Sequence, residues 1–112
     1  MEHGHSLVIP PHFDGNNYAY WKVRMKAFLK SIDERVWNSV EYGWEKPITP
    51  ISERQTSQKE AVAFNSNAMN AIFNAVSMEE FKRISNVEIA YTACNILQIV
   101  HEGTKAVKIN KL

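Results

Sequence analysis

The sequence predicts an all-α fold, a compact bundle of five or six short helices that follows an extended N-terminal arm. Apolar residues recur at steps of three and four in several segments, which is the spacing of one helix face. The motif Ser-x-x-Glu, typical of a helix start, stands at three of the expected starts. No segment shows the alternation of Val, Ile and Thr that is typical of strands.

An extended arm is expected at residues 1–16, because this segment lacks helical spacing and contains two adjacent prolines. It closes with Asp14-Gly15, a pair typical of turns. The helical domain is expected to follow over residues 17–112. A chain of 112 residues is about the size of one compact domain, so a single core is expected.

The first helix is expected from Tyr18 to about Ile32, with Asn16 or Asn17 as its cap. We interpret its apolar face as core; the alternative is an aromatic platform on which nucleic-acid bases stack. Most of its basic residues lie off that face, as does Tyr20. The predicted contact surface consists of Tyr20, Lys22, Lys26 and Lys30.

A second, shorter helix is expected to begin at the capping box Ser31-x-x-Glu34 and to end near Gly43. Its inward residues are Val36, Trp37 and Val40. Residues 44–56 contain two prolines and no helical spacing, so they are expected to form an exposed connection. The prolines form a PxxP motif, for which a simple linker is favoured over a ligand of an SH3-type groove.

Two further capping boxes, Ser57-x-x-Glu60 and Ser77-x-x-Glu80, are expected to open the third and fourth helices. The fourth is expected to break at Ser85-Asn86, and a fifth to run from Val87 toward Gly103. Residues 104–112 begin another helical pattern. The inward positions of these helices are Phe64, Ala68, Ala71, Ile72, Ala75, Phe81, Ile84, Ala90, Ala93, Cys94, Leu97 and Val100.

The predicted structural core combines the large residues of these faces with one residue of the arm. It consists of Phe13, Tyr18, Trp21, Met25, Phe28, Leu29, Trp37, Phe64, Ile72, Phe81 and Leu97. Full burial of each such side chain contributes about 1.5–3 kcal/mol to stability.

The charges are nearly balanced, because 13 Lys and Arg residues face 12 Asp and Glu residues and the net charge is +1. Such a chain has no overall attraction to phosphate backbones or acidic lipids, so a nucleic-acid site would need a local basic patch. Basic helix faces are more often a solubility feature. A nucleic-acid-binding module that uses these faces remains the alternative function.

The sequence contains no recognisable catalytic or metal-binding motif and has one cysteine, Cys94. Cys94 and His101 would lie about 10 Å apart along a helix, too far for direct proton transfer. We therefore expect no enzyme, cofactor, metal site or small-molecule substrate. The N-terminus lacks signal-peptide features and no apolar run is long enough to span a bilayer, so we expect a cytoplasmic or nuclear protein without a membrane partner.

Three stretches of the sequence carry a resemblance to a known family: "FDGNNYAYWKVRMKAFLKSIDERVWNSVEYGW", "NAIFNAVSMEEFKRISN" and "HEGTKAVKINKL". In this order, from about Pro10 to Leu112, they resemble the Gag polyprotein of plant copia-type long-terminal-repeat retrotransposons, in the N-terminal part of its capsid region. Phe13, Gly15, Tyr18, Trp21 and Leu29 match the recurrent signature that opens the family's capsid fold. The resemblance implies a capsid N-terminal-domain-like fold that self-associates into a particle around the element's RNA.

The chain departs from the family in two places. Ala93-Cys94 stands where the family typically has an alanine-tryptophan pair, and losing a large aromatic anchor costs about 3–5 kcal/mol in an unadjusted core. Family members continue into further capsid helices and a CCHC zinc knuckle, so the chain is expected to be a copy truncated at its C-terminal end. It is expected to be either a fragment of an element or a domesticated host gene product.

The resemblance thus implies a non-enzymatic module whose partner is itself or a related Gag protein, in a weak homo-oligomer. Its role would be particle assembly or, in a domesticated copy, interference with assembly. RNA binding through the basic surface and a host adaptor for an unrelated protein are the alternatives.

Overall fold

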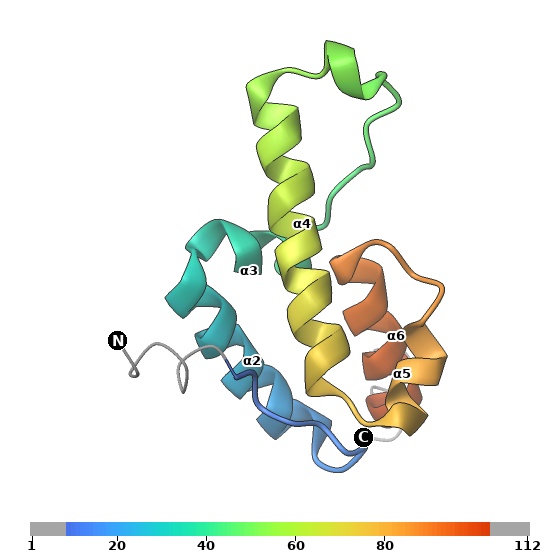
Figure 1. Ribbon diagram of the computed structural model, residues 1–112. Coiled ribbons are helices and arrows are strands. Elements are labelled where there is room, and N and C mark those ends of the chain that lie inside the picture. The colour runs from blue at the N-terminus through green and yellow to red at the C-terminus, as the bar shows by residue number, and fades with distance from the viewer. Residues whose placement is uncertain (1–8, 104–112) are drawn as a thin grey trace.

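The chain folds into helices packed around one long central helix (Figure 1). The computed structural model describes residues 9–103, which contain five α-helices, one short 3₁₀-helix and no strand. The elements are α2 (Tyr18–Ile32), α3 (Glu34–Glu41), η1 (Ile51–Glu53), α4 (Thr56–Ala75), α5 (Met78–Ile84) and α6 (Ala90–Glu102). The predicted all-α fold is confirmed. The first half of the predicted arm and the helical pattern at 104–112 lie outside the described residues.

Helix α4 organises the bundle. Its 20 residues make it about 30 Å long. In Figure 1, α2 and α3 lie on one side of its lower half, and α5 and α6 lie on the other. The upper half of α4 and residues 43–55 extend beyond the bundle as a projection.

The core is continuous from the arm to α6. The buried apolar residues are Phe13, Tyr18, Trp21, Met25, Leu29, Val36, Trp37, Val40, Ala68, Met69, Ala71, Ile72, Ala75, Ile84, Ala90, Ala93, Cys94 and Leu97. Most members of the predicted core are therefore buried, and Phe28 and Phe64 are half-buried against them.

Two predicted inward residues lie at the edge of the bundle. Phe81 is only half-buried, and its ring packs edge-on against Phe73 with 5.2 Å between centroids. It lies at the edge because the short helix α5 buries Glu80 and Ile84 instead. Val100 is exposed, since Cys94 and Leu97 define the buried face of α6.

The described part of the arm, residues 9–16, is built into the fold. The Phe13 N–H donates to the Ala75 carbonyl (2.8 Å), and the Ser77 N–H donates to the Phe13 carbonyl (3.0 Å). These bonds form a single parallel β-bridge between Phe13 and Val76. The Trp21 indole N–H donates to the Pro11 carbonyl (2.8 Å), so the arm is also fixed to α2.

Two predicted helix starts are wrong by about two residues. Asp33, not Ser31, caps α3, and its carboxylate accepts the Arg35 N–H at 2.8 Å. The Ser31 hydroxyl instead donates to the Phe28 carbonyl at 2.6 Å, within the preceding helix. Helix α4 begins at Thr56 rather than near Ser57, because the Gln58 side chain accepts the N–H of the cap residue Gln55.

Ser77 caps α5 as predicted, and its hydroxyl accepts the Glu80 N–H at 3.4 Å. The Glu80 side chain does not complete the capping box, because its partners are Arg83 and His101. Helix α6 begins at Ala90 and not at Val87. The cause is Asn65 of α4, which accepts the Ala90 N–H (2.9 Å) and donates to the Glu88 carbonyl (2.7 Å). A side chain from another helix thus takes the place of a local cap.

Candidate contact groove

A groove of about 520 Å³ lies between α2, α3 and α6, and we call it the contact groove. It is lined by Ala19, Lys22, Val23, Lys26, Trp37, Val40, Glu41, Tyr91, Cys94, Asn95, Gln98 and Glu102. The α2 residues lie at steps of three and four, so they form one strip along that helix. This strip borders the buried face of α2, and two of the four residues of the predicted contact surface, Lys22 and Lys26, belong to it.

The wall of the contact groove leaves apolar side chains uncovered. Val23 on α2 is 68% exposed and Tyr91 on α6 is 40% exposed. Trp37 and Val40 lie behind them and are buried. Grooves that combine apolar walls with a few polar groups are typical docking sites.

The two lysines of the contact groove are held by neutral partners. Lys22 donates to the Gln98 amide oxygen at 2.9 Å, and the Lys26 ammonium lies 5.7 Å from the centre of the Trp37 ring. Among the described residues, neither lysine forms an ion pair with a carboxylate. The Glu41 carboxylate accepts the Trp37 indole N–H at 2.5 Å.

The contact groove has no reactive nucleophile. Burial raises the pKa of the Cys94 thiol to about 12, so it stays protonated near neutral pH. Burial also raises the pKa of Tyr18, whose hydroxyl donates to the Cys94 carbonyl at 3.0 Å. The geometry therefore favours docking over covalent chemistry.

The other two residues of the predicted contact surface lie outside the groove. Tyr20 is exposed, and the Arg24 guanidinium lies 5.6 Å from the centre of its ring. Lys30 is exposed in the last turn of α2. The helical spacing identified all four as off the core face, but it could not separate the two that border a groove from the two that do not.

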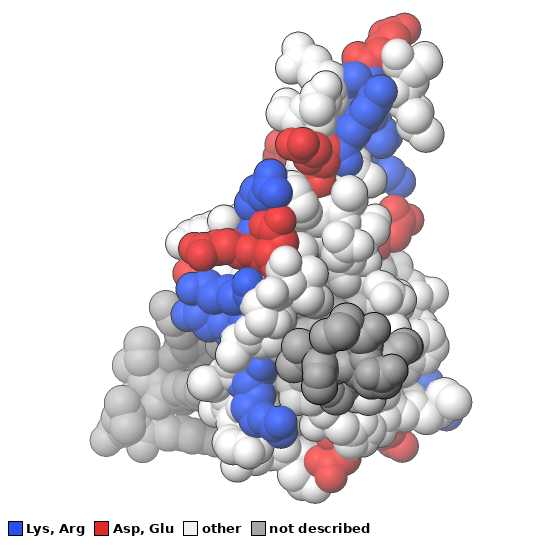
Figure 2. Space-filling view, turned by 60° about the vertical axis from the view of Figure 1, so that its left-hand side comes forward, with Lys and Arg blue, Asp and Glu red and all other residues white. Residues whose placement is uncertain are grey.

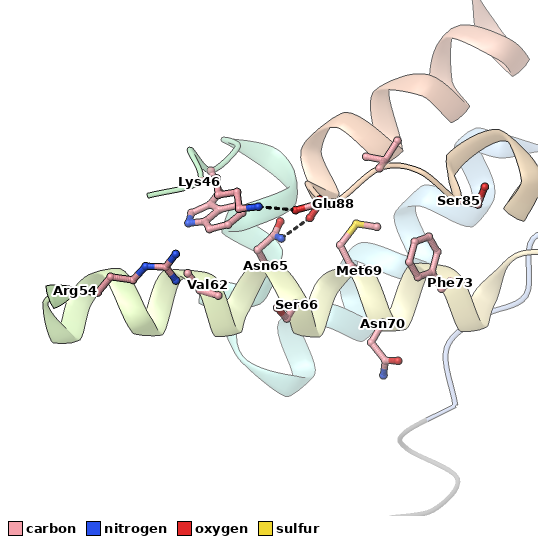
Figure 3. A pocket seen from close by; sticks show the side chains of 12 residues that line it. Lys46, Arg54, Val62, Asn65, Ser66, Met69, Asn70, Phe73, Ser85 and Glu88 are labelled. Carbon is pink, nitrogen blue, oxygen red and sulfur yellow. Dashed lines mark hydrogen bonds and ion pairs between the residues drawn. The ribbon is translucent and has the colours of Figure 1, made fainter. Parts of the chain in front are cut away.

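A second groove, of about 560 Å³, runs along α4 (Figure 3). Met69 and Phe73 point from α4 toward the segment before α6, and Asn65 bonds to that segment. Lys46 and Glu88 form an ion pair across the groove at 3.1 Å. Because its central polar groups already have partners, this groove serves mainly to join α4 to the start of α6.

Glu80 places a buried carboxylate next to the arm. The sequence alone indicates only that Glu80 belongs to a capping box. Glu80 is 3% exposed, and its Oε1 lies 2.7 Å from His101 Nε2 and 3.1 Å from Arg83 Nε. The His101 ring packs edge-on against Phe13, with 5.0 Å between centroids. All these partners lie within the fold, so the cluster fixes α5, α6 and the arm to each other.

The face seen in Figure 2 carries no uniform basic patch, because Lys and Arg are interleaved with Asp and Glu from the projection to the base. An example is Arg35, which binds Asp33 at 2.9 Å. Among residues 9–103, no group of three His, Cys, Asp or Glu side chains is arranged to hold a metal ion. No helix in the same part of the chain has the length and apolar character that crossing a membrane requires.

No protein-family model, no curated protein and no solved structure matches it.

Proposed function

We propose that this protein is a non-enzymatic, capsid-like module of the retrotransposon Gag type, and that it acts by binding copies of itself or related Gag proteins. The sequence resemblance motivates the proposal, and the all-α fold agrees with it. The observation that carries it is the contact groove, whose Val23 and Tyr91 expose apolar surface without a reactive group nearby.

Removal of this apolar surface from water is the expected source of binding energy. Fully burying a side chain such as Val23 contributes about 1.5–3 kcal/mol, and association first has to offset the loss of rigid-body freedom. One groove of this size therefore favours a weak homo-oligomer over a stable shell. Interfaces with a total area below about 1,200 Å² are typically weak and transient.

The test is sedimentation velocity over a wide range of protein concentration, in low and physiological salt, with and without single-stranded RNA. The proposal expects dimers or larger species that grow with protein concentration and form without RNA. A protein that stays monomeric and responds only to RNA at low salt would contradict it. That outcome would identify the basic face of α2 as a nucleic-acid surface.

The assembly role has a separate test, which is a pull-down of full-length Gag from an element with the same capsid signature. Binding that disappears in Val23→Glu would support co-assembly, or interference with it, through the contact groove. A matched control is Ile32→Glu, which changes a half-exposed residue of α2 that does not line the groove. Binding of Gag that is equally strong in both variants would contradict a role for the groove.

A further inference from the structure

The arm fills a slot in the fold with one side chain and two backbone groups. Phe13 is 1% exposed, and the centre of its ring lies 5.0 Å from that of Trp21 on α2 and 5.0 Å from that of His101 on α6. Its N–H and carbonyl bond to Ala75 and Ser77, which lie on either side of the connection from α4 to α5. We call this binding place the Phe13 slot.

Residues 14–17, which we call the hinge, join the arm to α2 through a sharp reversal. In Figure 1 the arm runs beside α2 and turns back at the base of the bundle. Two of the four hinge residues have a positive φ, Gly15 at 100° and Asn17 at 55°. Among residues 9–103, Asn17 is the only residue other than glycine with a positive φ. It caps α2, a position that usually has an extended backbone, so the reversal strains the hinge.

Little packing holds the hinge in this conformation. Asp14, Asn16 and Asn17 are exposed. The hydrogen bonds of their side chains are local, because Asp14 Oδ1 accepts the Asn16 N–H at 3.0 Å and Asn17 Oδ1 accepts the Tyr20 N–H at 3.4 Å. Straightening the hinge would therefore expose little buried surface, provided that Phe13 again finds a slot.

We propose that two copies of this protein exchange their arms, so that Phe13 of each copy fills the Phe13 slot of the other. The occupant is a second copy because the slot already fits this arm, and an exchanged arm repeats the same ring contacts and backbone bonds. Short hinges under strain favour such exchange, since the strain is released when the hinge extends from one copy to the other. The inference rests on the proposed self-association and names a contact that does not use the contact groove.

Arm exchange sets the size of the assembly. Both slots are filled once two copies have exchanged arms, so the contact closes as a two-fold dimer and does not grow. The slot contacts are the same in the monomer and in the exchanged dimer. The balance between the two states therefore depends on the hinge and on the protein concentration.

The first test changes the hinge at Gly15. A Cβ on Gly15 would lie 3.0 Å from Glu80 Oε2, and its positive φ is unfavourable for any other residue. Gly15→Ala thus penalises the monomer, whereas an extended hinge accepts alanine. One such residue shifts an equilibrium about tenfold, and a dimer has two hinges, so its dissociation constant should fall about a hundredfold in sedimentation velocity.

The matched control is Gly43→Ala, outside the arm and the hinge. Gly43 also has a positive φ, 88°, and a Cβ there would make an ordinary contact with Tyr91 at 3.5 Å. This variant should lower the melting temperature without favouring the dimer. An equal rise of the dimer in both variants would show an effect of general destabilisation and would overturn arm exchange.

Asn17→Gly should act in the opposite direction. Glycine takes a φ of 55° without strain, so the monomer gains stability relative to the dimer. The dissociation constant should rise. A dimer that becomes tighter instead would contradict the assigned role of the hinge.

The decisive test observes the exchanged arm directly. Equal amounts of ¹³C-labelled and unlabelled protein are unfolded together and refolded at high concentration, for the unmodified protein and for Gly15→Ala. Isotope-filtered NOE spectra then report only contacts between copies. Arm exchange predicts a contact between the Phe13 ring of one copy and the His101 ring of the other, because these rings pack edge-on in the slot.

The outcomes separate this inference from the proposed function. If dimers form without a Phe13–His101 contact between copies, arm exchange is wrong and the proposed self-association still stands. Val23→Glu, in the contact groove, should leave the exchanged dimer intact, and its loss would overturn the independence of the two contacts. If the unmodified protein and Gly15→Ala are both monomeric at every concentration, the inference and the proposed function fail together.

Discussion

The two halves of α4 lie in very different surroundings. Every buried residue of this helix falls between Asn65 and Ala75, where α3 and α6 pack around it. The half from Thr56 to Phe64 has no buried residue and continues from η1, which has none either. We call the bundle without the projection the body. The comparison indicates that the packing of the body supplies most of the stability, and that substitutions at exposed residues of the projection should cost little.

The largest expected effect on stability is that of Trp21→Ala in the body. Trp21 is buried, its ring lies 5.0 Å from that of Phe13, and its indole N–H holds the arm through Pro11. Loss of such a side chain costs about 3–5 kcal/mol, a large part of the stability of a small domain. Thermal or urea denaturation followed by circular dichroism measures the loss.

A matched control for this prediction is Trp44→Ala, near the start of residues 43–55. Trp44 is half-buried and lies outside the core cluster. Its removal should lower stability much less. Equal losses for the two tryptophans would contradict the division between body and projection.

The second effect is that of Asn65→Ala, at the point where the body meets the projection. The substitution leaves the Ala90 N–H and the Glu88 carbonyl without their partner. Leaving the buried Ala90 N–H unpaired costs about 1–3 kcal/mol. Urea denaturation should show this loss, whereas Asn67→Ala, at an exposed residue of the same helix, should leave the midpoint nearly unchanged.

Asn65 also illustrates what the sequence can and cannot predict. The apolar spacing of α2 predicts its buried face, because a core needs only the right residue type on the right side of a helix. Whether a polar residue such as Asn65 is buried depends on which distant segment comes near it. The late start of α6 follows from that tertiary contact, so local signals at Val87 could not indicate it.

The same reasoning applies to the candidate site. The sequence places Lys22 and Lys26 off the core face of α2, but the contact groove exists only where α6 brings Tyr91 and Gln98 beside them. Sequence reasoning gave residues 44–56 no role beyond an exposed connection. Proline content predicts exposure there, while the projection itself depends on the path of α4 past the body.

The third effect is a small dependence of stability on pH, which arises from Asp33 at the junction of α2 and α3. Hydrogen bonds from Arg35, first from its side chain and then from its backbone N–H, hold the pKa of Asp33 below its usual range. A carboxyl group with a lowered pKa in the folded state stabilises the protein above its usual pKa. This contribution is lost as the pH falls through the lowered value.

Asp33→Asn removes the charge and keeps a side chain that can cap α3. When the pH is lowered from neutral to about 3, just below the usual pKa of Asp, the unmodified protein loses part of this contribution and Asp33→Asn does not. The melting temperature of the unmodified protein should therefore fall more than that of the variant. Differential scanning calorimetry at both pH values makes the comparison. A larger fall in the variant would contradict the assigned role of Asp33.

The smallest expected effect on stability is that of Ile48→Lys in the projection. Ile48 is completely exposed, so the substitution removes no buried area and the melting temperature of the monomer should not change. Calorimetry on dilute protein checks this. A clear loss of stability would show that Ile48 packs against the rest of the fold.

The most direct test of the proposed self-association is a dilution series of ¹H–¹⁵N NMR spectra of the unmodified protein. Rising concentration should shift the signals of the residues of α2 and α6 that line the contact groove. The signals of α4 from Asn65 to Ala75 should not move. Shifts confined to any other surface, or no shifts at high concentration, would contradict the account.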